Sequence, residues 1–585
     1  MKRMTKWSSS FLRDMCGDEE DNMSISDVGM LFKFVGGIGF FLYGMHIMAD
    51  GLQKAAGNRM KSMLGFFTKN RFVAVVMGAL ITALLQSSTA TTVMTVGFVN
   101  AGMLTLKQAV GVIMGANIGT TFTAWLVSLS ELGMSFKPEF IAPLFVGLGA
   151  FGVLFSKSEQ KKKIGEIIVG FGVLFIGFGF MSEAIAPYKN AQIFYDTFSV
   201  LGNNPILAIL SGIVVTAIMH SSAASVGILQ TLAMNGIVTW QSAVFITLGQ
   251  NIGTCITAVY SGAGASTNAK RASILHLLFN VFGAIWCGIL AYIIFRFRAD
   301  IALKTISSVD ISIFHTVFNT SNTIILFPLA GVMVRFSEKL IREKPVALSE
   351  DETIESARIE EVRRHLDRRI LKNPSFAIET GVQQVLAMAD IARTNFYLAL
   401  EAFNETEKES AKAKEKQVVR TENTINELEK MLTEFLVDVD NLSLTEEQHS
   451  KVKTLFYMII DAERIGDHSE NVAELAKKKR KEKITFSDKS EKDLEKMIHA
   501  TSETLDGALA AYKQDDKTMA SIAKQCEEGV DALEKKLRDK HISRLSKGKC
   551  EPTAGVLFLD LLVNLERVAD HADNIAGYVL GEEAP

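Results

Sequence analysis

The hydrophobic positions divide the chain into two unlike parts. Apolar residues dominate from about residue 29 to 337, and the stretches 72–106, 108–130 and 197–269 contain no Asp, Glu, Lys or Arg. From about residue 338 onward charged residues are frequent, and few glycines or prolines interrupt the helical periodicity after residue 374. This pattern predicts an all-α protein, with a polytopic membrane domain followed by a soluble helical domain.

Seven apolar stretches have the length of a membrane-spanning helix. They are 29–52, 107–129, 139–156, 164–185, 240–260, 271–295 and 311–336. Two further stretches, 72–105 and 205–237, are apolar but hold a polar cluster near the middle. As one helix either would run about 50 Å, much longer than the hydrocarbon core of a bilayer. We therefore expect two re-entrant hairpins that turn at the polar clusters, where irregular backbone must be buried in protein or line a water-filled cavity.

The polar clusters are duplicated along the chain. Gln86-Ser87-Ser88 is matched by His220-Ser221-Ser222, and the motif Gly-x-Asn-x-Gly-Thr occurs around both Asn117 and Asn251. Both pairs of motifs lie 134 residues apart, from Gln86 to His220 and from Asn117 to Asn251. One shared offset indicates a single long repeat, which is typical of a transporter with internal symmetry.

Basic residues predict the orientation of these repeats. They fall in three groups between the predicted spans: Lys54, Arg59, Lys61, Lys69 and Arg71; Lys157 and Lys161 to Lys163; and Lys270 with Arg271. The positive-inside rule places all three groups in the cytoplasm. The first hairpin then enters from the cytoplasm and the second from outside, so we expect two inverted repeats and a cytoplasmic soluble domain. The N-terminal tail, which carries four basic residues of its own, would lie outside, and its orientation stays open.

Two shorter motifs are also duplicated. Gly37, Gly39 and Gly44 are matched by Gly170, Gly172 and Gly177, and we interpret these glycines as positions where helices pack closely. The pairs His276/Asn280 and His315/Asn319 each share one helix face. Hydrogen bonding between helices and a role in a substrate path both stay open for these pairs.

The duplicated clusters offer hydroxyl and amide groups but no Lys or Arg, and His220 is their one titratable group. A helix that starts at a hairpin turn presents free N–H groups that favour an anion, whereas hydroxyl and carbonyl oxygens suit Na⁺. An anion bound there needs co-bound cations, which predicts coupling to Na⁺ or H⁺, and the lack of membrane-embedded Asp and Glu argues against a carboxylate proton relay. The candidate substrate- and ion-binding residues are Gln86, Ser87, Ser88, Thr89, Asn117, Thr120, Thr121, His220, Ser221, Ser222, Asn251 and Thr254.

These motifs resemble the type II sodium/phosphate cotransporter family over roughly residues 30–337. The resemblance implies that the paired hairpins form the phosphate and sodium site. It carries that role onto Gln86, Ser87, Ser88, Ser221 and Ser222. The chain departs from the family pattern at His220, where glutamine is usual, and has Thr89 and Ala223 where a third serine is common. These departures leave the ion stoichiometry open.

A second duplication lies in the soluble part. The motif Glu-Arg-x-x-Asp-His begins at Glu463 and recurs at Glu566, 103 residues later. Carboxylates four residues apart share one helix face, where they can ligate a divalent or iron-type metal or form salt bridges with the neighbouring arginines. The candidate metal ligands are Glu463, Asp467, Glu566 and Asp570. The motif resembles PhoU-like domains, which implies two three-helix bundles and a regulatory role linked to phosphate.

Four segments follow from these patterns. They are a polar tail (1–28), a membrane domain (29–337), a linker (338–373) and a PhoU-like domain (374–585). Within the membrane domain, repeat 1 covers about 29–156, repeat 2 about 164–295, and the final span is 311–336. The first 28 residues lack the apolar core of a signal peptide, so we expect a multi-pass protein of the plasma membrane, the inner membrane in a bacterium.

Composition excludes several classes of function. The five cysteines show no paired spacing, so neither a disulfide framework nor a zinc site is expected, and a net charge of −3 indicates no nucleic-acid partner. No nucleophile–base set or Gly-rich phosphate loop is visible, so we predict no enzyme activity. The predicted function is sodium-coupled transport of inorganic phosphate by alternating access within the lipid bilayer. Transport or export of another small anion, a membrane-anchored phosphate or metal sensor with a vestigial transport core, and a homo-oligomer all stay open.

Overall fold

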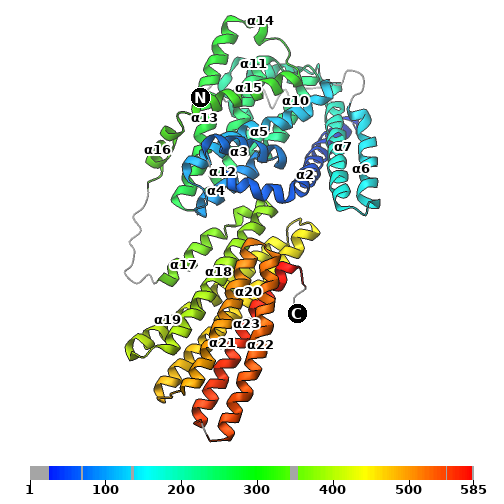
Figure 1. Ribbon diagram of the computed structural model, residues 1–585. Helices are drawn as coiled ribbons and strands as arrows, with labels where there is room; N and C mark the ends of the chain where they lie inside the picture. The colour runs from blue at the N-terminus through cyan, green and yellow to red at the C-terminus, as the bar shows by residue number, and fades with distance from the viewer. Residues whose placement is uncertain (1–24, 68–69, 133–137, 343–353, 549, 583–585) are drawn as a thin grey trace.

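The computed structural model describes residues 25–67, 70–132, 138–342, 354–548 and 550–582. Over these residues the protein is all-helical, and the one extended feature is an isolated bridge between Thr239 and Thr305. The membrane domain lies at one end of an elongated molecule and the C-terminal helices at the other (Figure 1). Most of the predicted polar tail lies outside the described residues, and the first helix already begins at Ile25.

The described part of the membrane domain contains the 3₁₀ helix η1 (Ala186–Tyr188) and fifteen α-helices. They are α2 (Ile25–Phe67), α3 (Arg71–Leu85), α4 (Ser88–Asn100), α5 (Leu106–Leu132), α6 (Pro138–Phe155), α7 (Glu159–Ile185), α8 (Gln192–Asn203), α9 (Pro205–Met219), α10 (Ser222–Met234), α11 (Trp240–Gly253), α12 (Cys255–Gly262), α13 (Thr267–Phe297), α14 (Ala299–Ala302), α15 (Ser308–Leu326) and α16 (Ala330–Leu340). Among the described residues five helices are long and apolar enough to cross a membrane, or up to seven if each of two bent pairs is one span. Large apolar side chains such as Phe140 and Tyr260 are more than four-fifths exposed (83% and 84%), as lipid-facing residues are. The protein is therefore a membrane protein.

The upstream glycines pack helices together as their spacing predicted. A Cβ atom on Gly44 would lie 2.3 Å from the backbone N of Leu174, and one on Gly177 would lie 2.3 Å from the backbone N of Phe41. Helices α2 and α7 can therefore touch only because these positions lack a side chain. Gly39 is the exception, since a Cβ there would meet nothing within 4 Å.

Two features of the membrane domain differ from the predicted spans. The last span was expected to be continuous over 311–336, but α15 and α16 are bent by 82°. Pro328 lies in the break, and a proline ring removes a helix hydrogen bond and clashes with the preceding turn. The other difference is α8, a short helix before the second hairpin that meets α9 at 114°.

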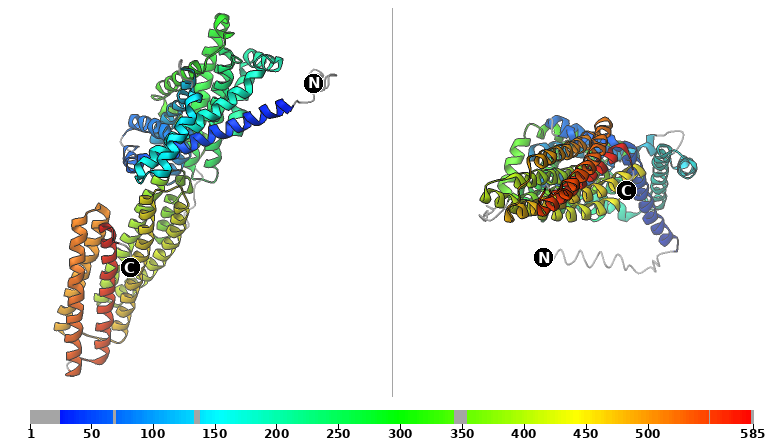
Figure 2. Two further views of the ribbon diagram at one scale, coloured as in Figure 1. Left: turned by 90° about the vertical axis from the view of Figure 1, so that its right-hand side faces the viewer. Right: turned by 60° about the horizontal axis from the view of Figure 1, so that its bottom comes forward.

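The soluble part contains a short entry segment and two three-helix bundles. The entry segment comprises α17 (Ile354–His365) and the 3₁₀ helix η2 (Arg368–Lys372) within the predicted linker. Helices α18 (Pro374–Asn404), α19 (Lys408–Asp440) and α20 (Glu446–Lys481) form the first bundle. Helices α21 (Asp488–Gln514), α22 (Lys517–Ser546) and α23 (Pro552–Leu580) form the second. The two bundles lie side by side in both views of Figure 2.

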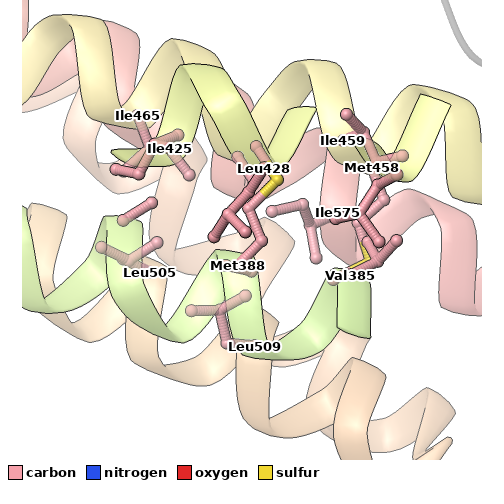
Figure 3. Close-up of a cluster of buried hydrophobic side chains, with 14 of the residues drawn as sticks. Val385, Met388, Ile425, Leu428, Met458, Ile459, Ile465, Leu505, Leu509 and Ile575 are labelled. Carbon is pink, nitrogen blue, oxygen red and sulfur yellow. The ribbon is translucent and has the colours of Figure 1, made fainter. Parts of the chain in front are cut away.

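One apolar core joins the two bundles. Met388 and Leu428 of the first bundle face Leu505, Leu509 and Ile575 of the second (Figure 3). All except Leu509 are fully buried, and Leu509 is 6% exposed. Because each bundle buries its inner face against the other, the two bundles form one structural unit.

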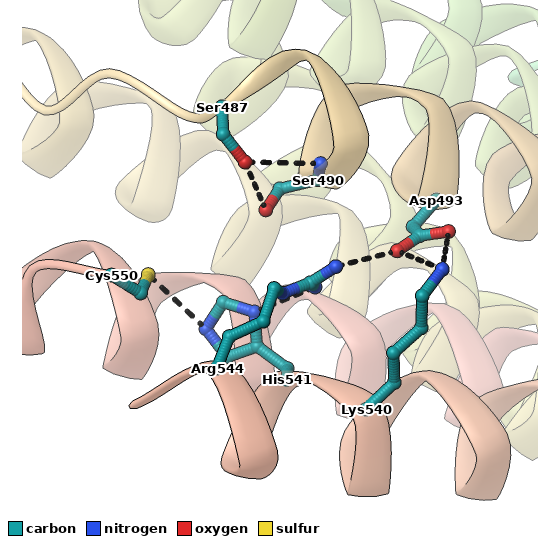
Figure 4. A network of polar contacts seen from close by, with 7 residues as sticks. All are labelled: Ser487, Ser490, Asp493, Lys540, His541, Arg544 and Cys550. Carbon is teal, nitrogen blue, oxygen red and sulfur yellow. Dashed lines mark hydrogen bonds and ion pairs between the residues drawn. The ribbon is translucent and has the colours of Figure 1, made fainter. Parts of the chain in front are cut away.

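A polar network fastens α21 to α22 in the second bundle (Figure 4). Asp493 accepts hydrogen bonds from Lys540 at 2.7 Å and from Arg544 at 2.9 Å, and Arg544 also donates to Nδ1 of His541 at 2.9 Å. Burial alone would raise the pKa of Asp493, but the two cations hold the pKa below its usual value. The carboxylate therefore stays charged and paired at neutral pH.

Candidate functional site

The first hairpin turns at Gln86. Helix α3 ends at Leu85, Gln86 adopts the left-handed conformation (φ 51°, ψ 24°), and α4 begins at Ser88. A positive φ is uncommon for a residue other than glycine and is often held in place at functional sites. Ser87 caps α4 by accepting a hydrogen bond from the backbone N–H of Ala90 at 3.1 Å. Beyond the turn the two arms are linked by a hydrogen bond from the hydroxyl of Thr82 to that of Thr91 at 2.9 Å.

The second hairpin repeats this geometry 134 residues later. His220 is left-handed (φ 50°, ψ 20°), and Ser221 accepts a hydrogen bond from the N–H of Ala224 at 3.2 Å. Across the arms, the hydroxyl of Thr216 donates to that of Ser225 at 2.9 Å. The predicted breaks at both polar clusters are confirmed, and the two turns share one backbone conformation although their first residues differ.

The glycines of the Gly-x-Asn-x-Gly-Thr motifs allow the first arm of each hairpin to pack closely against the helix that follows the hairpin, α5 or α11. A Cβ atom on Gly115 of α5 would lie 1.9 Å from the carbonyl oxygen of Val75 in α3. In the second repeat, a Cβ atom on Gly249 of α11 would lie 2.0 Å from the carbonyl oxygen of Ile209 in α9. Backbone contact of this kind holds the first arm of each hairpin rigidly in place.

The polar members of these motifs donate hydrogen bonds within their own helix. Asn117 donates to the carbonyl of Ile113 at 2.8 Å, Thr120 to that of Ala116 at 2.9 Å, and Thr121 to that of Ile118 at 2.8 Å. In the second repeat, Asn251 donates to the carbonyl of Thr247 at 3.4 Å, and Thr254 donates to that of Asn251 at 2.6 Å. The single hydroxyl donors of Thr120, Thr121 and Thr254 are therefore occupied, and these hydroxyls offer only oxygen lone pairs to their surroundings, which suits a cation better than an anion.

The two turns differ in how their first side chain is held. Gln86 is 8% exposed, donates to the carbonyl of Ala83, and accepts a hydrogen bond from Thr123 at 3.0 Å. His220 is exposed, and Thr257, at the repeat position of Thr123, donates to the carbonyl of Thr254 at 2.9 Å instead. Sequence reasoning did not single out Thr123, although its place in the duplicated motif was a usable signal.

The serines and Thr89 start the second arm of each hairpin. Ser88 and Ser222 are buried, while Ser87, Thr89 and Ser221 are half-buried. In the part of the chain that the structure describes, each turn forms its hydrogen bonds within its own repeat and none reaches the other turn. Gln86 is thus hydrogen-bonded to the helix that carries the Gly-x-Asn-x-Gly-Thr motif of its own repeat, and among the described residues no hydrogen bond joins it directly to His220.

The buried histidines line the helices behind the second hairpin. Nε2 of His315 and Oδ1 of Asn251 lie 3.3 Å apart, which joins α15 to α11. Asn280 donates to Sγ of Cys255 at 3.2 Å, which joins α13 to α12. These contacts favour hydrogen bonding between helices for His315 and Asn280. Asn319 instead donates to the carbonyl of His315 in its own helix at 2.9 Å, and the ring nitrogens of the buried His276 have no hydrogen-bond partner among the described residues.

The acidic motifs of the soluble part form salt bridges. Arg464 donates to Asp467 at 3.1 Å, and Arg567 donates to Asp570 at 3.1 Å. Burial raises the pKa of both Glu463 and Glu566, and the neighbouring Asp467 and Asp570 add to the effect. Each motif thus holds more negative charge than its arginine neutralises.

A third carboxylate pair, which sequence reasoning missed, completes the acidic cluster on the second bundle. Oxygens of Glu527, Asp531 and Asp570 all lie within 4.8 Å of one another. Burial and then Asp531 raise the pKa of Glu527 to about 7. Glu527 and Asp531 repeat the Glu-x-x-x-Asp spacing of the duplicated motif, so the signal was present in the sequence. Three convergent carboxylates can hold a cation with oxygen ligands.

The histidines of the duplicated motif join the bundles. Nδ1 of His468 and Oδ1 of Asn564 lie 2.9 Å apart, and Nδ1 of His571 and Oδ1 of Asp461 lie 2.8 Å apart. The two rings stack with their centroids 5.8 Å apart. The histidines therefore contribute to packing between the bundles.

Comparison with known proteins agrees with this architecture. The family described as Na+/Pi-cotransporter matches residues 40–183 and 190–313, and the PhoU domain matches residues 385–476 and 494–579. The uncharacterized protein YqeW of Bacillus subtilis (strain 168) is 30% identical over 317 residues, which are 54% of this chain and 99% of that protein. The chain belongs to the Na+/Pi-cotransporter family. The resemblance found in the hairpin motifs is thereby confirmed, and so is the PhoU domain.

Two further relatives of this family member carry phosphate in their names. The putative inorganic phosphate export protein YjbB of Salmonella typhimurium is 23% identical over 555 residues, 94% of this chain and 97% of that protein. The sodium-dependent phosphate transport protein 2B of Homo sapiens is 34% identical over 112 residues, 18% of this chain and 16% of that protein. The chain thus belongs to a phosphate-transport family and carries a C-terminal PhoU domain.

Proposed function

We propose that the protein carries inorganic phosphate across the membrane together with Na⁺, and that the two hairpin turns form the binding site. The observation that carries this proposal is the identical backbone of the turns at Gln86 and His220, each followed by a serine-capped helix start. Two turns of the same backbone shape offer two sets of N–H groups at helix starts to one tetrahedral anion.

The chemistry at the start of α4 and α10 fits an anion. The N–H groups of Ser88 and Thr89, and those of Ser222 and Ala223, precede the first backbone hydrogen bonds of their helices. Such N–H groups and the helix dipole favour phosphate. Because α4, α9 and α10 contain no charged side chain, the charge of phosphate needs bound cations, and the oxygens of Asn117, Thr120, Thr121, Asn251 and Thr254 are the proposed Na⁺ ligands.

The placement of the hairpin ends supports inverted repeats. The first hairpin ends at Asn100, whose side chain donates to Asp367 of the soluble part at 2.6 Å. Just after the second hairpin, Asn235 donates to Ser182 at 3.2 Å, near the end of α7. With the soluble domain in the cytoplasm, the first hairpin enters from the inside and the second from the outside, so alternating access can proceed around both turns.

The PhoU domain is the proposed regulator. Its acidic clusters are formed by Glu463 and Asp467, and by Glu566 and Asp570 with the additional Glu527 and Asp531. Each is the proposed site of a divalent or iron-type metal. Metal occupancy would relieve the mutual repulsion of these carboxylates, and would thereby couple the conformation of the bundles to ligand levels.

The direction of transport follows the combined gradients. The name of one relative refers to export and that of another to sodium-dependent transport, and a carrier can run either way. Neither direction needs a chemical step, so we expect no enzymatic turnover.

Radiolabelled phosphate flux into proteoliposomes tests the proposal. An inward Na⁺ gradient is expected to accelerate uptake, a K⁺ gradient of equal size is the control, and excess sulfate is expected not to compete. Uptake that ignores Na⁺ would contradict the coupling. Competition by sulfate with loss of phosphate uptake would indicate another anion, and no uptake of any anion would favour a sensor.

A further inference from the structure

The soluble domain rests directly on the inner end of the first hairpin. A Cβ atom on Gly97 of α4 would lie 3.1 Å from Cβ of Arg369 and 3.5 Å from Cγ1 of Ile370 in η2. Next to it, the rings of Phe98 and Phe376 pack edge to face with centroids 5.5 Å apart. Phe98, Ile370 and Phe376 are at most 1% exposed, so the 3₁₀ helix and the start of α18 are sealed against α4.

Hydrogen bonds of Asn100 fix the orientation of this contact. The amide of Asn100 donates to Oδ2 of Asp367 at 2.6 Å, and its oxygen accepts a hydrogen bond from the backbone N–H of Ser266 at 2.8 Å. Asp367 is the N-cap of η2, accepts from the N–H of Arg369 at 2.9 Å, and has a side chain only 8% exposed. Ser266 is the N-cap of α13. The side chain of Asn100 thus links the first hairpin, the entry segment of the soluble part and α13 by hydrogen bonds.

The second hairpin has a different anchor. Asn235, directly after α10, donates to Ser182 of α7 within the membrane domain. Among the described residues, the soluble part contacts the inner end of the first hairpin, whereas Asn235 at the end of the second hairpin is held within the membrane domain. The contact with α4 is made by the segment 367–372 and by Phe376 at the start of α18. This contact lets the PhoU domain act directly on the first hairpin.

We propose that Asp367 and η2 form a clamp that holds the first hairpin in place and must release before this hairpin can move. The inference rests on the proposed function, because it assumes that movement of the hairpin carries phosphate. Because this buried contact joins the first hairpin to the soluble domain, a conformational change in that domain can alter how readily the hairpin moves. In this account the resting PhoU domain restrains the carrier, and a change in the bundles frees it.

A reversible cross-link tests whether the clamp must open. A Cβ atom at position 97 would lie 3.1 Å from Cβ of Arg369, slightly closer than the separation of about 3.5–4.5 Å found in disulfides, so a small shift allows Gly97→Cys with Arg369→Cys to be oxidised to one. Oxidation is expected to lower phosphate flux about 10-fold or more, and reduction to restore it. The single variants, oxidised in the same way, are the matched controls. Full flux in the cross-linked protein would overturn the clamp.

A charge swap tests the same inference without a cross-link. Asn100→Asp places a carboxylate against Asp367 and is expected to raise flux about 5-fold, while adding Asp367→Asn restores the pair and returns flux to the wild-type rate. An Asn100→Asp variant that transports no faster than wild type, or that is not corrected by the second change, contradicts the proposal. If the wild-type protein shows no phosphate flux in the same vesicles, the proposed function fails instead.

Discussion

The hydroxyl of Thr123 donates a hydrogen bond to Oε1 of Gln86 at 3.0 Å. At the equivalent positions of the second repeat, Thr257 donates to its own helix and His220 is exposed. Two turns with the same backbone therefore present a fixed amide on one side and a free imidazole on the other. The two halves of the site are equivalent in shape and unequal in chemistry.

Thr123→Val should weaken the first half of the site. The change keeps the shape but leaves Oε1 of Gln86 without its donor, a loss of about 1 kcal/mol that corresponds to a several-fold rise in half-saturating phosphate or Na⁺. Thr257→Val, at the same position of the other repeat, is the matched control and should change these values little. Flux titrations of both variants measure the effect, and equal responses would contradict the asymmetry.

His220→Gln should make the two turns chemically alike. The two positions share one backbone conformation, so the variant should fold like the wild type. An imidazole and an amide offer different hydrogen-bond donors and acceptors, so half-saturating phosphate or Na⁺ should change several-fold if the side chain of His220 belongs to the site. Flux titrations measure the effect, and identical titrations for the two proteins would remove His220 from the site.

Gly115→Ala and Gly249→Ala should both destabilise the membrane domain. Each new methyl would lie 1.9 or 2.0 Å from a carbonyl oxygen of the adjacent hairpin arm. Overpacking of this kind costs about 1–3 kcal/mol or forces the hairpin away from its helix. Thermal unfolding in detergent measures the loss. Gly147→Ala, where a Cβ meets nothing within 4 Å, is the control and should be at least as stable as wild type.

Asp531→Asn should weaken metal binding to the second bundle. Mn²⁺ titration calorimetry on the full chain should show about 10-fold lower affinity at the cluster with Glu527 and Asp570, because one charged oxygen ligand is lost. Affinity of the wild-type protein should also fall below about pH 7, since the pKa of Glu527 is about 7 and its protonated form does not bind. The exposed neighbour Glu528→Gln is the control. Unchanged Mn²⁺ affinity in Asp531→Asn would exclude this cluster.

Much of this architecture was predictable because local constraints set it. A 33-residue apolar stretch with His220-Ser221 at its centre is too long for one span, so the break at the polar cluster followed from length alone. The bend between α15 and α16 was not predicted. Pro328 was a usable signal for it, but the sequence on both sides is apolar, so the length of the apolar stretch indicated one continuous span. Two contacts could not be predicted in this way: the hydrogen bond from Thr123 to Gln86, and that from Asn100 to Asp367, 267 residues away. Both depend on tertiary packing, which the periodicity of apolar residues does not report.

The most direct test of the paired site is Na⁺-driven phosphate flux in proteoliposomes containing Ser87→Ala or Ser221→Ala. Each change removes the cap of a hairpin helix, a loss of about 1 kcal/mol in ordinary helices, together with a proposed phosphate ligand. The control is Ser211→Ala, which lies in the same hairpin as Ser221. The hydroxyl of Ser211 donates to the carbonyl of Ala208 in its own helix at 2.8 Å. We predict that both cap variants lose most Na⁺-dependent flux while Ser211→Ala keeps it. Wild-type flux in either cap variant would contradict a site built from both turns.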